Sequence, residues 1–141
     1  MIKRLLVDTG VWYALFSRRD AHRWHANSMA IKLADAETLV LPWPALYETL
    51  RSRFVKESHA LAEFMEYVDE ANVDFLDSRP YDERVLAVTY DWALEKGRPL
   101  SMVDCLLRLV IEDECAAIDA LATFNHRDFY DVCAAHDVLL L

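Results

Sequence analysis

Short apolar runs alternate with longer segments of helical periodicity along the whole chain. In the longer segments apolar residues recur every three or four positions, which is typical of a helix with one buried face. The short runs are predicted to be buried strands, at residues 2–7, 38–41, 73–76, 116–123 and 138–141. Strands that alternate with helices favour a mostly parallel central sheet covered on both faces, and therefore an α/β fold.

Capping residues indicate where several of the helices begin and end. The helices are expected at residues 11–16, 21–34, 44–54, 58–70, 81–96 and 102–112. Asp20, Ser58 and Ser101 are predicted N-caps, because their side-chain oxygens can accept from the free backbone N–H groups of a first turn. Pro44 suits a first turn, and Gly97 is expected to end the helix before it.

Composition supports the same fold class. The chain has 141 residues, of which 55% are hydrophobic, and this is enough to bury a core within one domain. It has only 2 Gly and 4 Pro, so there is little material for the many tight turns of an all-β sandwich or barrel. We expect a single domain over residues 1–141.

The negative net charge of the chain restricts how it can bind nucleic acid. The formal net charge is −9, from 15 Lys and Arg against 24 Asp and Glu. A surface of that sign does not hold phosphate by bulk charge, so a nucleic-acid enzyme of this kind must gather its positive charge locally or take it from metal ions. The same charge suits a basic protein partner.

The cysteines and the N-terminal residues bear on location. The chain has an odd number of cysteines, Cys105, Cys115 and Cys133, and none of them form a C-x-x-C pair. This favours a reduced, cytoplasmic setting. The basic pair Lys3-Arg4 is followed by only three apolar residues, far short of a signal peptide, and no apolar stretch approaches the length of a membrane span.

Three acids occupy positions where a parallel sheet forms its sites. Asp8 directly follows the first predicted strand, Glu48 lies on the helix after the second, and Asp104 is in the first turn of the apolar helix after Ser101. Sites of such folds form at the carboxyl ends of the strands, so the three carboxylates are expected to converge. Two carboxylates ~4 Å apart repel by about 4 kcal/mol at an effective dielectric of 20, and a divalent cation between them removes that cost. Oxygen ligands suit Mg²⁺ or Mn²⁺, which can activate water for attack on a phosphodiester.

Each acid also has a plainer interpretation. Asp8 can serve only as the cap of the following helix, and Glu48 can be a solvated acid that favours the helix dipole. Asp104 lies in an apolar setting where an idle acid is uncommon. The combination carries the hypothesis more than any single residue does.

Four motifs follow one another along the chain: Leu5-Leu6-Val7-Asp8-Thr9, Leu46-Tyr47-Glu48, Leu100-Ser101-Met102-Val103-Asp104 and Leu121-Ala122-Thr123-Phe124-Asn125-His126-Arg127-Asp128-Phe129. In this order they resemble the motifs of the PIN-domain ribonucleases, in particular the VapC toxins of type II toxin–antitoxin systems. The resemblance runs from Ile2 to about Phe129. It implies a three-layer α/β/α fold, an Mg²⁺- or Mn²⁺-dependent endoribonuclease, a homodimer, and a small antitoxin that blocks the site.

The resemblance also assigns roles to single residues. It implies that Asp8, Glu48, Asp104 and Asn125 are catalytic and that Asp8 and Asp104 hold the metal. Asn125 stands where the family often has Asp, and an amide removes one negative charge from the site, so the number of metal ions stays open between one and two. Asp128 is either a substitute acid or an exposed loop residue.

Hydroxyl groups stand beside the acids. Thr9, Ser101 and Thr123 are predicted supporting residues that orient the carboxylates or hold water, or else ordinary capping and turn residues.

Basic residues form two groups in the sequence. One group is Arg18, Arg19 and Arg23, and the other is Arg51, Arg53 and Lys56. Arg18, Arg19 and Arg51 are candidates for contact with the RNA backbone, and the alternative for all of them is a solvated face. His22 and His25 are a weak metal signal, since no Cys or Glu completes a zinc set.

A second function remains open from the sequence. The chain can be a PIN-fold module that binds RNA or protein without cutting it, and the motivation is Asn125 together with the acidic net charge.

Overall fold

All five strands lie parallel in one sheet, in the order β3-β2-β1-β4-β5. The computed structural model describes residues 1–51 and 54–141 with their side chains, and residues 52 and 53 only as part of a helix. The strands are β1 (Arg4–Val7), β2 (Thr38–Pro42), β3 (Val73–Leu76), β4 (Ala120–Ala122) and β5 (Leu139–Leu140). β1 is central, with Leu6 opposite Val40 on one side and Leu121 on the other. The predicted parallel sheet is confirmed.

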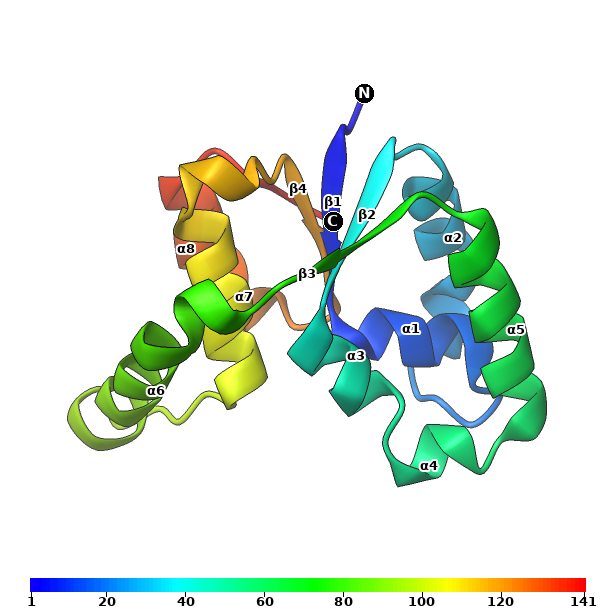
Figure 1. Ribbon diagram of the computed structural model, residues 1–141, viewed down its shortest axis with the longest axis horizontal. Helices are drawn as coiled ribbons and strands as arrows, with labels where there is room; N and C mark the ends of the chain where they lie inside the picture. Colours follow the sequence, from blue (N-terminus) through cyan, green and yellow to red (C-terminus); the bar gives the residue numbers. More distant parts are fainter.

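Helices cover both faces of this sheet (Figure 1). One layer contains α1 (Thr9–Phe16), α2 (Ala26–Ala34), α3 (Trp43–Thr49), α4 (Ser52–Val55) and α5 (Ser58–Glu70), and the other contains α6 (Asp82–Tyr90), α7 (Met102–Glu112) and α8 (His126–Ala135). Side chains alternate along a strand, so Leu5 packs into the first layer and Leu6 into the second. The expected three-layer α/β/α arrangement is therefore confirmed.

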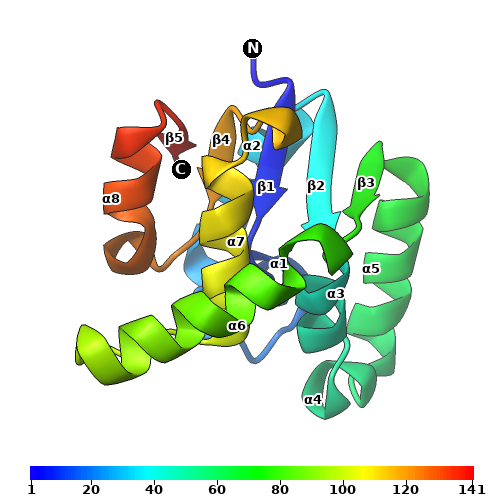
Figure 2. The ribbon, with the colours of Figure 1, turned by 60° about the vertical axis from the view of Figure 1, so that its left-hand side comes forward.

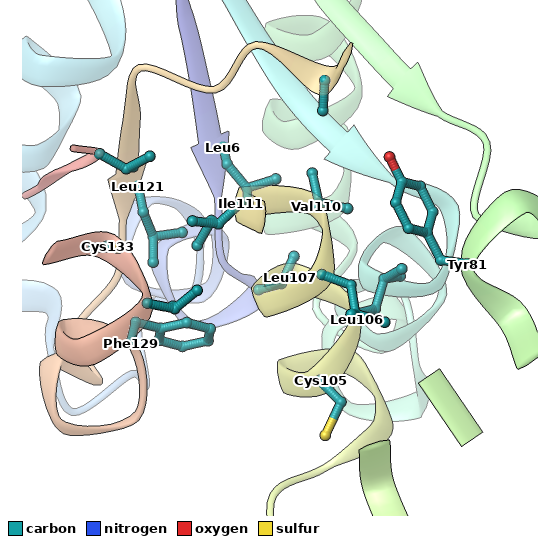
Figure 3. Packing of buried hydrophobic residues seen from close by; sticks show 14 of the residues in the cluster. Leu6, Tyr81, Cys105, Leu106, Leu107, Val110, Ile111, Leu121, Phe129 and Cys133 are labelled. Carbon is teal, nitrogen blue, oxygen red and sulfur yellow. The ribbon is translucent and has the colours of Figure 1, made fainter. Parts of the chain in front are cut away.

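The core of the second layer is built mainly by α7. Every residue from 105 to 111 is buried, and Figure 3 shows Leu107 and Ile111 of α7 beside Leu6 of β1. Ser101 caps the helix in a reciprocal capping box with Asp104, so the predicted N-cap is confirmed. The cap and the apolar face together set where the first turn of α7 lies against the end of the sheet.

Local structure departs from the prediction in the first helical layer. The helix expected over 21–34 begins only at Ala26, after a 3-10 turn η1 (Arg23–His25), although Asp20 does accept from the His22 N–H at 2.8 Å. The helix expected over 44–54 is two helices, because α3 ends at Thr49 and α4 follows a break. Ser58 is the first helical residue of α5, so the residue at the cap position is Glu57.

Two elements around α7 also differ from the prediction. The helix expected over 81–96 is α6 followed by a π-helical segment, η3 (Asp91–Glu95), and Gly97 with φ +65° ends it as predicted. The fourth strand is shorter than residues 116–123, because a 3-10 turn η4 (Glu114–Ala116) occupies its start and Ala117 adopts a left-handed conformation. Within the described part of the chain, no helix is both long and apolar enough to cross a bilayer.

Candidate active site

Asp8 lies at the carboxyl edge of the central strand. Its backbone N–H donates to the Ala122 carbonyl of β4 at 3.0 Å, and its side chain accepts from the Thr9 N–H at 2.7 Å as the N-cap of α1. The capping role considered from the sequence is therefore real. It uses only Oδ1, while Oδ2 accepts from the Thr123 hydroxyl at 2.7 Å.

The environment of Asp8 opposes its negative charge. The pKa of Asp8 is raised from 3.8 to about 6. Burial is the main cause, the nearby charges of Asp104 and Glu48 contribute in the same direction, and the hydrogen bonds from Thr123 and Thr9 oppose the rise. Two carboxylates from other elements thus act on Asp8 at this edge. A group held this way is costly to ionise and is a typical feature of functional sites.

Glu48 is brought to the same edge by α3, which starts directly after β2. The Thr9 hydroxyl donates to Glu48 Oε2 at 3.0 Å, and the Tyr13 hydroxyl donates to the Glu48 carbonyl at 2.9 Å. Thr9 therefore contacts two acids, Asp8 through its backbone and Glu48 through its side chain. Figure 2 shows α1 and α3 leaving the same end of the sheet.

Asp104 reaches the site from the first turn of α7. Its backbone N–H donates to Ser101 Oγ at 3.0 Å, and its Oδ2 accepts from the Ser101 N–H at 3.4 Å. Ser101 thus holds Asp104 within the capping box, which leaves Asp104 Oδ1 outside the box.

The oxygen atoms of these acids suit a hard divalent cation, but the acids do not surround one completely. Among the residues the structure describes, no group of three or more His, Cys, Asp and Glu side chains converges closely enough to hold an ion by itself. The acids supply carboxylate oxygens only. A bound cation would stabilise the ionised form of Asp8 and so lower its raised pKa. A site of this type fits Mg²⁺ or Mn²⁺, which keep several waters and take few protein ligands.

The Asn125 side chain takes no part in the hydrogen bonds around Asp8, Glu48 and Asp104 that the structure describes. Its amide nitrogen donates to Asp128, which is also paired with Arg98, while its backbone N–H donates to Thr123 Oγ1 at 3.0 Å. Asp128 lies in the first turn of α8 and is largely buried, so it is not an exposed loop residue. Among described residues, no hydrogen bond joins the Asn125 side chain to Asp8, Glu48 or Asp104.

The family comparison finds the PIN domain over residues 5–135, from β1 through α8. The chain belongs to the PIN domain family. The resemblance carried by the four sequence motifs is confirmed, since all four fall within the matched residues.

Solved structures show where this PIN domain stands among known folds. VapC20 of Mycobacterium tuberculosis, a toxin that cleaves the sarcin–ricin loop, is similar with a TM-score of 0.67 at 20% identity, over 93% of this chain and 94% of that chain. VapBC2 of Rickettsia felis, solved with a DNA fragment from its promoter, is similar with a TM-score of 0.58 at 16% identity, over 98% and 97%. No curated protein sequence matches the chain. At these identities the similarity is one of fold.

The basic residues of the PIN domain are arranged differently from their grouping in the sequence. Arg18, Arg19 and Lys56 line one surface hollow of about 300 Å³ together with Glu57. Arg51 lines a smaller hollow of about 170 Å³ with Tyr13, whose hydroxyl contacts Glu48. Arg18, Arg19 and Arg51 thus remain candidates for RNA contact, while the side chain of Arg53 lies outside the described residues.

Sequence reasoning missed two residues that hold the site together. Tyr13 is four positions after Thr9 on α1, so the helical period places both on the face toward Glu48. Arg98 pairs with Asp128 across 30 residues, and no local pattern indicates that contact.

Proposed function

We propose that this PIN domain is an Mg²⁺- or Mn²⁺-dependent endoribonuclease and the toxin of a type II toxin–antitoxin system. The observation that carries the proposal is Asp8, a largely buried acid with a pKa raised to about 6, at a strand end where the charges of Asp104 and Glu48 act on it. Family membership supports nuclease chemistry, and one structural relative is a toxin that cleaves RNA of the sarcin–ricin loop.

Each polar residue has a role in this proposal. Asp8 and Asp104 would hold the cation, which when bound activates water and stabilises the charge that develops on the phosphodiester. The Thr123 hydroxyl and the Ser101 backbone N–H orient these two carboxylates by direct hydrogen bonds. Thr9 fixes the Glu48 carboxylate by a hydrogen bond, and Glu48 would accept a proton from the attacking water.

The test is an RNA cleavage assay on the purified chain during titration with Mg²⁺ or Mn²⁺. We expect cleavage that requires the cation and that falls by at least ~10²-fold in Asp104→Asn, because a carboxylate ligand is lost. The matched control is Asp69→Asn, an exposed acid on α5 that should cleave like the wild type. Full activity in Asp104→Asn would refute the assignment. RNA that is bound but not cut by the wild type would favour the non-cleaving binding module.

We also propose a cognate antitoxin that places a basic side chain, most suitably Arg, against the three acids. The acid cluster and the net charge of −9 attract a cationic segment, and the planar guanidinium pairs with carboxylates through two hydrogen bonds. Binding measured by calorimetry should weaken as salt rises. Unchanged affinity for a variant that lacks the carboxylates of Asp8, Glu48 and Asp104 would contradict this.

The expected assembly is a homodimer in the cytoplasm. The Trp43 ring contacts the rings of Tyr47 on α3 and Phe75 on β3, and all three are exposed. Exposed aromatic rings are enriched at protein interfaces, and light scattering would give the molar mass directly. The reduced setting is supported by Cys105, Cys115 and Cys133, which are all free thiols.

A further inference from the structure

A surface hollow of about 360 Å³ adjoins the acids on the β4 side of the sheet. It lies between the segment that leads into α2 and the start of α8. The residues that line it include His22, His25, Lys32, Phe124, His126 and the buried Thr123. Thr123 is the link to the candidate active site, because its hydroxyl donates to Asp8 Oδ2 at 2.7 Å.

The charge of this hollow differs from that of the whole chain. None of its lining residues, all of which are described, has an acidic side chain, although the chain carries 24 Asp and Glu. Lys32 provides a cation, and the three imidazoles provide N–H donors. Such a lining favours an anionic group over the cationic side chain expected at the acids next to it.

A stacked pair of rings forms one wall. The His22 and Phe124 rings are nearly parallel, with centroids 4.6 Å apart and an angle of 9° between planes, and His25 also contacts Phe124 at 6.0 Å. His22 is exposed, so this stack presents a flat ring to solvent. Nucleobases stack on such rings with little dependence on sequence.

Metal binding explains the three histidines poorly. The His22 and His25 ring centroids are 6.4 Å apart, and His126 Nε2 lies 3.1 Å from the Leu141 carbonyl oxygen, a contact that uses a protonated ring nitrogen. Among the described residues, no set of three His, Cys, Asp and Glu side chains can hold an ion. The volume, by contrast, falls in the range of small-ligand pockets, about 300–1,000 Å³.

We propose that this hollow binds the nucleotide next to the scissile phosphate of a single-stranded RNA, with its base on the His22–Phe124 stack and its phosphate at Lys32. The inference rests on the proposed ribonuclease function, since Thr123 joins the hollow to Asp8. In this proposal the base contacts the stacked His22 and Phe124 rings, and the phosphate contacts the Lys32 ammonium group. A single-stranded region is required, because a paired base cannot stack on a protein ring.

The experiment measures binding of a labelled single-stranded RNA oligonucleotide, in EDTA so that no cleavage occurs, together with cleavage in Mn²⁺. We expect His22→Ala to raise Kd roughly ten-fold, as for the loss of one stacked base, and His22→Phe to bind within about three-fold of the wild type. Lys32→Ala should raise Kd and flatten its salt dependence by about one phosphate contact. His136→Ala and Lys3→Ala, exposed residues outside the hollow, are the matched controls and should leave Kd unchanged.

The outcomes separate this inference from the proposed function. If RNA is bound through His22 but never cut, the hollow stands and the nuclease proposal fails. If RNA is cut while His22→Ala and Lys32→Ala keep wild-type Kd and kcat/KM, the nuclease stands and the hollow is refuted. Equal effects of His22→Ala and His22→Phe, competition by double-stranded RNA as strong as by single strands, or weakening of antitoxin binding alone would also overturn it.

Discussion

Replacing Asp8 by Asn is expected to have two large effects of opposite sign. RNA cleavage should be lost, because a carboxylate at the centre of the candidate metal site is removed. In the metal-free protein at pH 8, the free energy of unfolding should rise by up to about 3 kcal/mol. The estimate follows from a pKa raised from 3.8 to about 6, at 1.36 kcal/mol for each pKa unit.

The sign of this effect follows from linkage. The folded state holds the Asp8 proton more tightly than the unfolded state, so ionising Asp8 costs stability in the fold. That cost is absent below about pH 4, grows between pH 4 and 6, and is constant at higher pH. Asn cannot ionise, and it keeps both contacts, since its oxygen can accept from the Thr9 N–H and its amide can donate to Thr123 Oγ1.

Urea unfolding in EDTA at pH 4 and pH 8 measures the effect as the difference between variant and wild type. The variant should gain stability at pH 8 but little at pH 4. Adding Mg²⁺ should then stabilise the wild type and leave the variant almost unchanged, which reverses their order if the ion binds tightly. A gain of the same size at both pH values would show that the charge of Asp8 is not its cause.

The second large effect is expected at Arg108, which holds α8 on α7. Arg108 is 8% exposed, and its guanidinium donates to both carboxylate oxygens of Asp131 and to the Asp128 carbonyl, at 2.6–2.8 Å. It also lies over the Trp92 ring, 4.8 Å from the centroid. Arg108→Met should lower the free energy of unfolding by about 2–3 kcal/mol, because the partly buried Asp128 carbonyl loses this donor and a two-bond ion pair is removed. The value stays below that of a fully buried pair, since Asp131 is more than half exposed and its carboxylate regains water.

The loss should also reach the site. Asp104 is one helical turn before Arg108 on α7, and Asn125 directly precedes α8, so loosening of the two helices should reduce cleavage as well as stability. The control is Asp131→Asn, which keeps one acceptor for Arg108 and should cost clearly less. Arg108 lowers the pKa of Asp131 to about 2, so this pair stabilises the fold above pH 4 and loses its effect as pH falls toward 2. Urea unfolding and cleavage rates test both variants, and a change below about 0.5 kcal/mol in Arg108→Met would contradict the structural role.

Local sequence patterns were sufficient for the fold class and for the positions of the acids. The apolar run before Asp8 predicted a buried strand, and a buried parallel strand needs no more than such a run. Ser101 predicted the start of α7, because an N-cap accepts from backbone N–H groups within its own first turn. Sequence patterns predicted helix boundaries less well where one helix ends and another begins, as at Leu50 between α3 and α4. Apolar residues keep the helical period across such a break, so the sequence alone does not reveal it.

The properties of the site depend on contacts between residues distant in the chain. Asp8 and Thr123 are separated by 115 residues, Thr9 and Glu48 by 39, and no periodicity connects either pair. The raised pKa of Asp8, the pairing of Asp128 with Arg98, and the acid-free hollow beside Thr123 were therefore decided by the tertiary structure alone. Sequence determined which residue types stand at strand ends and helix starts, because those positions follow from local backbone preference. Packing of the two helical layers on the sheet decided which of those side chains meet, because burial and charge act through space rather than along the chain.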